Sequence, residues 1–216
     1  MNLKTALLSL FLCVVLIGCG QEKRYHDTQQ LASSDNKKIK AVLQFQKELN
    51  DEYRDPETSP LLDKHRKTFE TLDFFPPDTT YVVIARFERT PDAVPFLMAT
   101  TTDRKAHEVV YGIAHFELNG KPHKLEVYQS LDLVRKTQYK DYLFLPFLDE
   151  TNGAETYGGG RYIDLTIPEG NTLVIDFNKA YNPYCVYNKK YSCPLVPRQN
   201  FLGTPVRAGV KDFVPN

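Results

Sequence analysis

The sequence predicts a mainly β domain: an antiparallel β-barrel or sandwich of about eight strands with one or two N-terminal α-helices. From residue 79 onward, short runs rich in Val, Ile, Tyr, Phe and Thr are interrupted by turn residues about every eight to twelve positions, which is typical of antiparallel sheets. Before residue 79 the apolar residues instead recur at helical spacing. No internal repeat or compositional boundary divides residues 37–216, so we expect one domain.

The helical segment covers residues 37–54, "KKIKAVLQFQKELNDEYR". Its apolar residues fall near one face of a helix: Ile39, Val42, Leu43, Leu49 and Tyr53. Asp55-Pro56 should end this helix. Ser59-Pro60 has the N-cap and first-turn pairing of a short second helix through Leu62.

The β-rich part contains eight candidate strands. They cover residues 81–88, 96–101, 108–118, 124–130, 143–147, 161–167, 172–177 and 205–210. Asn119-Gly120 should join the third and fourth strands as a tight hairpin. We also expect a second hairpin, between residues 161–167 and 172–177, that turns at Pro168–Asn171.

The N-terminus predicts export and lipidation. One cation, Lys4, precedes a run from Ala6 to Gly18 that is apolar except for Ser9 and is too short to span a bilayer. Leu16-Ile17-Gly18-Cys19 resembles the lipobox of bacterial lipoproteins, in which the cysteine is lipidated and the chain is cut before it. The alternatives are an ordinary signal peptide with a chance cysteine and an uncleaved anchor helix.

We therefore divide the chain into a signal peptide at residues 1–18, a flexible tether at 19–36 and a β-rich domain at 37–216. The tether is polar and has too few apolar residues to form a core. The prediction is a cell-envelope protein held to a membrane, on the periplasmic side or at the cell surface, by lipid on Cys19. Removing residues 1–18 takes away one lysine, so 27 basic and 27 acidic residues become 26 and 27. This balance predicts no nucleic-acid partner.

The remaining cysteines predict a disulfide. Cys13 leaves with the signal peptide and Cys19 carries lipid, so Cys185 and Cys193 are left in an oxidising compartment, where we expect them to pair. A redox pair would more typically have C-x-x-C spacing. Zinc needs three or four ligands, and no histidine follows His123, so we expect no metal and no cofactor.

Two polar stretches, 143–165 and 176–195, contain the candidate binding residues. These are Arg161, Tyr162, Asp164, Asp149, Glu155, Asn178, Tyr181 and Asn182. The second expected hairpin would bring Gly158–Asp164 and Asn178–Tyr184 together at one end of the sheet, where sites are often built. Arg161 should face asparagine or carboxylate partners, either sealed in a structural pair or open to an anionic group.

Composition leaves three function classes open. The tyrosines and asparagines of 178–191 suit a surface that binds a small molecule, a glycan or a protein partner, although they would equally suit a loop packed down by its own rings. Asp149 and Glu155 offer the carboxylates of a hydrolase acting on envelope glycans or peptides. The third class is a purely structural envelope component. No P-loop ending and no G-x-S-x-G motif occurs, so a ligand- or partner-binding domain is the main prediction and the hydrolase is the alternative.

Several segments resemble the bacterial family called domain of unknown function 1684. They are "SPLL", "FFPPD", "PFLDETNGAETYGGGRYIDL", "IDFNKAYNPYCVYNKKYSCPLVP" and "VRAGVK". The resemblance runs from the first helix to Val210 and implies no known activity and no catalytic residues. Residues 196–200 lack the Glu of the family's usual Pro-Pro-x-Glu-Asn, and Val210 replaces the Glu of Arg-Ala-Gly-Glu. Two carboxylates are therefore missing, which counts against any mechanism that needs them.

Overall fold

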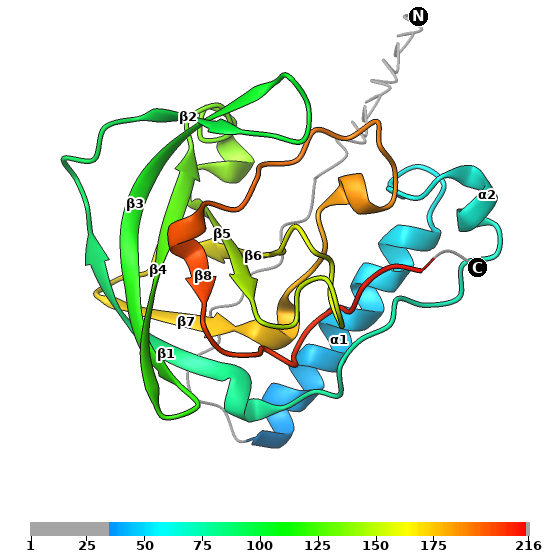
Figure 1. Ribbon diagram of the computed structural model, residues 1–216, viewed down its shortest axis with the longest axis horizontal. Coiled ribbons are helices and arrows are strands. Elements are labelled where there is room, and N and C mark those ends of the chain that lie inside the picture. The colour runs from blue at the N-terminus through cyan, green and yellow to red at the C-terminus, as the bar shows by residue number, and fades with distance from the viewer. Residues whose placement is uncertain (1–34, 215–216) are drawn as a thin grey trace, which may run out of the picture.

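Eight strands form one curled sheet, and two helices lie beside it (Figure 1). The computed structural model describes residues 35–214. The helices are α1 (Asp35–Arg54) and α2 (Asp63–Arg66). The strands are β1 (Val82–Arg89), β2 (Phe96–Ala99), β3 (Lys105–Leu118), β4 (Lys121–Ser130), β5 (Tyr142–Asp149), β6 (Arg161–Thr166), β7 (Thr172–Asp176) and β8 (Phe201–Leu202). Single 3-10 turns cover Thr79–Tyr81, Thr137–Tyr139, Phe177–Lys179, Tyr184–Val186 and Arg198–Asn200.

The sheet has the order β6-β5-β4-β3-β1-β7, with β2 paired to β3 and β8 paired to β5. Every strand pair is antiparallel except β5 with β8. The sheet curls into a half-barrel, which confirms the predicted mainly β class. The predicted signal peptide, Cys19 and nearly all of the predicted tether lie outside the described residues. Neither helix within 35–214 is long and apolar enough to cross a membrane.

The hairpin at Asn119-Gly120 is confirmed. Leu118 of β3 pairs directly with Lys121 of β4, so only two residues make the turn. Asn119 and Gly120 have φ angles of 53° and 69°. Two consecutive positive φ angles are what a type I′ turn requires, and Asn-Gly is the dipeptide that adopts them most readily.

The hairpin expected between residues 161–167 and 172–177 is wrong. β6 pairs with β5, and β7 pairs with β1 at the other end of the sheet order. The connection between them extends these two ladders, because Ile167 donates its N–H to Asp141 and Asn171 accepts from Phe87. The segment at Pro168 therefore crosses from one end of the curled sheet to the other.

The strand expected at 205–210 is also absent. Its backbone lies beside β5 and β6 but forms no ladder; only Val210 makes an isolated bridge, to Phe74. The carbonyls of Val206, Ala208 and Val210 accept instead from the guanidinium of Arg161. A side chain thus replaces the neighbouring strand, and the eighth strand is the short β8.

Apolar side chains fill both faces of β5. One face contributes Leu143, Leu145 and Phe147 to the main core inside the curl. The other contributes Tyr142 and Phe144 to a second, tyrosine-rich cluster. A strand buried on both faces needs no alternation of polar residues, and seven of the eight residues of β5 are buried.

The helix predicted at 37–54 is confirmed as α1, which begins at Asp35. Its buried face contains Phe45, whereas Leu43, expected in the core, is half exposed. α1 packs on Val210 and on Tyr187, which lies in the loop that contains Cys185 and Cys193, called the cysteine loop below. The second helix is α2, which begins at Asp63 and so follows the predicted segment: Ser59 accepts from the Leu61 N–H as an N-cap would and donates to Tyr53 O, but residues 59–62 are not helical.

Candidate functional site

Arg161 and Asp149 form a fully buried ion pair. The Arg161 Nη2 group donates to Asp149 Oδ2 at 2.9 Å, and both side chains have 0% exposure. The other acceptors of the guanidinium are the three carbonyls of residues 206–210. Asp149 Oδ1 in turn accepts from the N–H of Thr151 at 2.8 Å and of Val206 at 3.0 Å.

This pair is sealed. Burial lowers the pKa of Arg161, and the adjacent Asp149 carboxylate opposes that shift. Because a buried charge is costly unless it is paired and hydrogen-bonded, this pair is a structural contact in which each charge is neutralised by the other. Of the two arrangements that the sequence left open for Arg161, the structure has the closed one.

The two predicted polar stretches do meet. Tyr162 and Tyr181 form an isolated antiparallel bridge, with N–H to carbonyl distances of 2.9 and 3.0 Å. Asp164 Oδ1 accepts from the hydroxyls of Tyr142 at 2.8 Å and Tyr181 at 2.6 Å. Burial, with the Asp164 charge second, raises the pKa of both tyrosines, so they remain protonated donors. The expected juxtaposition of Gly158–Asp164 with Asn178–Tyr184 is confirmed, although no hairpin produces it.

The remaining predicted residues are also bound within the protein. Asn178 accepts from Asp78 N–H and donates to Asp78 O, both at 2.8 Å. Asn182 donates to Lys211 O at 2.9 Å. Glu155 holds Arg207 through two Nε contacts of 2.9 and 3.0 Å. With Asp149 buried and Glu155 paired, these carboxylates do not form a free acid and base facing a common cavity.

Cys185 and Cys193 are free thiols, so the disulfide predicted from compartment and spacing is not found. The spacing correctly indicated proximity. The sulfur of Cys193, however, accepts a hydrogen bond at 3.2 Å from the N–H of Cys185, which lies in the turn Tyr184–Val186. Within residues 35–214, no cluster of three or more His, Cys, Asp or Glu could hold a metal ion.

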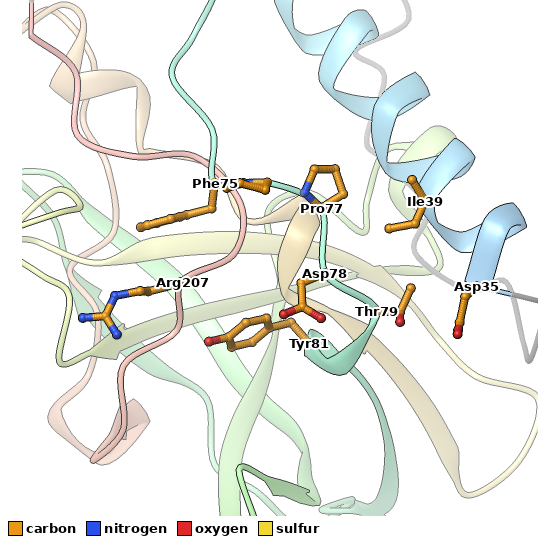
Figure 2. Close-up of a pocket in the computed structure, with 9 residues that line it drawn as sticks. Asp35, Ile39, Phe75, Pro77, Asp78, Thr79, Tyr81 and Arg207 are labelled. Carbon is orange, nitrogen blue, oxygen red and sulfur yellow. The ribbon is translucent and has the colours of Figure 1, made fainter.

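An open groove lies on another part of the surface, between α1 and the C-terminal segment (Figure 2). We call it the Tyr81 groove, and its volume is about 550 Å³. This is within the range of small-ligand sites, roughly 300–1,000 Å³. Its lining residues are Asp35, Ile39, Phe75, Pro76, Pro77, Asp78, Thr79, Tyr81 and Arg207.

Two charged groups of this groove are held in fixed positions. The Arg207 contacts to Glu155 use Nε and Nη2, which leaves Nη1 with hydrogen-bonding capacity. The Asp78 contacts to Thr80, at 2.8 Å from its N–H and 2.7 Å from its hydroxyl, fall on Oδ1 and leave Oδ2 with capacity. In Figure 2 the Tyr81 ring lies between these two side chains, with its hydroxyl directed toward Arg207.

The sequence patterns give no prediction of this groove. "FFPPD" contributes only to the family resemblance, and Arg207 contributes to that resemblance and to an expected strand. The available signal is local, since the two prolines before Asp78 have no N–H to contribute to a ladder. The other residues of the groove come from α1 and from position 207, and sequence patterns do not reveal that these distant parts of the chain lie close together in space.

Within residues 35–214, the fold and these sites define a half-barrel β domain with a buried Arg161–Asp149 pair and an open groove beside α1. The chain belongs to the family described as "Protein of unknown function (DUF1684)", whose sequence pattern matches residues 67–211. An uncharacterized protein of Haloarcula marismortui, solved by solution NMR, is 31% identical with a TM-score of 0.63. The match covers 82% of this chain and 96% of the other. None of the curated proteins compared with this chain is significantly similar to it.

Proposed function

We propose that this protein is a lipid-anchored cell-envelope protein whose β domain binds a glycan in the Tyr81 groove. The observation that carries the proposal is the groove itself, which combines an apolar lining with polar groups at fixed positions. The anchoring part is supported by the lipobox-like Leu16–Cys19 segment after a short apolar run.

The groove has the two features that a sugar ring requires. Tyr81, Pro77 and Ile39 offer apolar surface against which the C–H face of a ring can lie. Asp78 and Arg207 offer an acceptor and a donor at the edge for hydroxyl groups. Their orientation by Thr80 and Glu155 reduces the entropy lost on binding.

The sealed predicted site supports binding over hydrolysis. A glycoside hydrolase needs two carboxylates that flank the scissile bond. Asp149 is fully buried against Arg161, and Glu155 is engaged by Arg207. The hydrolase alternative therefore has no observation in its favour.

The test is a titration of the full-length protein in detergent with soluble β-linked N-acetylglucosamine oligosaccharides, monitored by calorimetry. We expect saturable binding that weakens at least tenfold, or about 1.4 kcal/mol, in Tyr81→Ala and in Arg207→Ala. Arg86→Ala is the matched control, because Arg86 is an exposed arginine of β1 that pairs with Glu88 away from the groove. Absence of binding to a panel of envelope oligosaccharides, or undiminished binding by Tyr81→Ala, would refute the proposal.

A further inference from the structure

The two free cysteines lie against each other on a loop outside the Tyr81 groove. The Cys185 N–H donates to Cys193 Sγ at 3.2 Å, and the Cys193 N–H donates to Thr101 Oγ1 at 3.1 Å. The loop is fixed to the end of β2, because Thr101 donates its N–H to Cys193 O at 2.9 Å. These contacts hold both sulfurs in place.

The surroundings of Cys185 favour its thiolate. The hydrogen bond from Cys193 lowers the pKa of Cys185 to about 7, burial opposes this shift, and the Thr101 hydroxyl adds to it. Backbone N–H groups of the turn, those of Cys185 and Val186, contribute in the same direction.

The two sulfurs differ in access. Cys185 is partly exposed, whereas Cys193 is buried, with 6% of its surface exposed. The hydrogen bond that stabilises the Cys185 thiolate raises the pKa of Cys193, because Cys193 must keep its proton to donate. An accessible thiolate beside a buried thiol is the arrangement of an attacking and a resolving cysteine.

We propose that Cys185 is a nucleophilic thiol that exchanges with small organic disulfides and that Cys193 resolves the product. In the first step the Cys185 thiolate attacks one sulfur of the disulfide RSSR, and RS⁻ leaves. In the second step Cys193 loses its proton and attacks Cys185 Sγ, which expels the second RS⁻. Both RS⁻ groups take up protons, so the two thiols are oxidised to one bond and RSSR is reduced to two RSH.

This proposal does not depend on the glycan-binding function. The cysteine loop and the Tyr81 groove share no lining residue. The free-thiol pair in the structure is the reduced form from which the exchange begins. C-x-x-C spacing is not required, because the turn Tyr184–Val186 and the contact of Cys193 with Thr101 bring the two cysteines together across seven intervening residues.

The first experiment uses oxidised glutathione with the full-length protein, previously reduced with a phosphine, and maps each cysteine by mass spectrometry. In Cys193→Ser we expect a glutathione adduct to accumulate on Cys185. In Cys185→Ser the thiol of Cys193 should remain unmodified. In the unsubstituted protein Cys185 and Cys193 should become joined, with release of two glutathione molecules.

The second experiment measures the pH dependence of Cys185 alkylation by iodoacetamide, which separates an electronic role of Cys193 from a structural one. Cys193→Ser retains an O–H donor, so the midpoint should stay near 7, as in the unsubstituted protein. Cys193→Ala removes the donor, so the midpoint should rise toward the ordinary thiol value of about 8.5.

Three results would overturn the proposal. The first is modification of Cys193 in Cys185→Ser as fast as that of Cys185 in Cys193→Ser. The second is an alkylation midpoint for Cys185 at the ordinary value. The third is protein, trapped with N-ethylmaleimide on isolation, in which the two cysteines are already joined and resist thiol reductants in the folded state.

Discussion

Arg161 donates to Asp149 at 2.9 Å with neither side chain exposed, and this contact ties together three separate parts of the chain. Asp149 ends β5, and Arg161 begins β6. Through their remaining hydrogen bonds the two residues also hold the backbone of residues 206–210. At this end of the half-barrel the guanidinium thus supplies the hydrogen-bond donors that a neighbouring strand would otherwise provide.

Arg161→Ala should lower the free energy of unfolding by about 3–5 kcal/mol, the usual cost of leaving one member of a buried ion pair alone. The substitution leaves Asp149 charged in the interior and three carbonyls without their donor. Chemical denaturation followed by circular dichroism measures the change.

Arg207→Ala is the control for this prediction, since the Arg207–Glu155 pair is exposed. Exposed pairs contribute about 0–1 kcal/mol, so this variant should unfold close to the unsubstituted protein. An equal loss of unfolding free energy in both variants would contradict the prediction that the buried pair contributes more to stability than the exposed pair.

Gly160→Ala should also destabilise the protein, by roughly 1–3 kcal/mol. Gly160 has a φ of 88°, and a Cβ there would lie 2.6 Å from Phe147 O. Gly158→Ala is the matched control in the same loop, because its nearest atom would be 3.7 Å away. Thermal unfolding of the two variants compares them, and similar midpoints would contradict the close approach at Gly160.

Glu108 predicts a pH-dependent stability. It lies in β3 opposite Ser130, is 3% exposed, and its Oε2 has no hydrogen-bond partner. Burial raises the pKa of Glu108 to about 7; the bond from Ser130 opposes this, Asp132 adds to it and Arg104 opposes it. The folded state therefore holds the proton more tightly than the unfolded state, whose value is 4.5.

The contribution of Glu108 to the free energy of unfolding is therefore largest below pH 4.5 and decreases as the pH rises to about 7. Its magnitude is on the order of 3 kcal/mol. Glu108→Gln removes the titrating group, so denaturation curves at several pH values should lose this slope. A slope that persists in Glu108→Gln would assign the dependence to other groups.

Cys19→Ala should release the protein from membranes or leave its precursor unprocessed, because the substitution removes the thiol that the lipobox-like segment predicts to be lipidated. Cell fractionation and the mass of the N-terminal peptide provide the measurement. Cys13→Ala, within the apolar run, should leave processing and fractionation unchanged. Membrane retention of Cys19→Ala without an acyl group would disprove the anchor.

Local signals in the sequence predicted the fold class well. Asn119-Gly120 specified its turn because both residues tolerate positive φ angles, and seven of the expected strands occur near their expected positions. Pairing partners were harder to predict. Residues 161–167 and 172–177 are adjacent in sequence, yet each pairs with a distant strand, since register and order depend on contacts across the whole sheet.

The candidate site shows the same division. Polar composition correctly identified residues that meet, such as Tyr162 with Tyr181, but did not show that their side chains bind mainly to other parts of the protein. Arg161 is an example, because a sequence does not distinguish a sealed guanidinium from an open one. Arg207 is not among the predicted site residues, because the other residues of its groove lie more than a hundred positions earlier in the chain.

The dependence of Arg161 on residues 206–210 has a consequence for how the chain matures. A nascent chain that stops short of Val210 contains the β5 and β6 residues of the ion pair but lacks carbonyls that the guanidinium needs. Closure of this end of the half-barrel must therefore wait until residues 206–210 have been synthesised. Because those residues are the last part of the domain to be made, we expect this end of the half-barrel to fold after synthesis of the domain is nearly complete, and not while the chain is still growing.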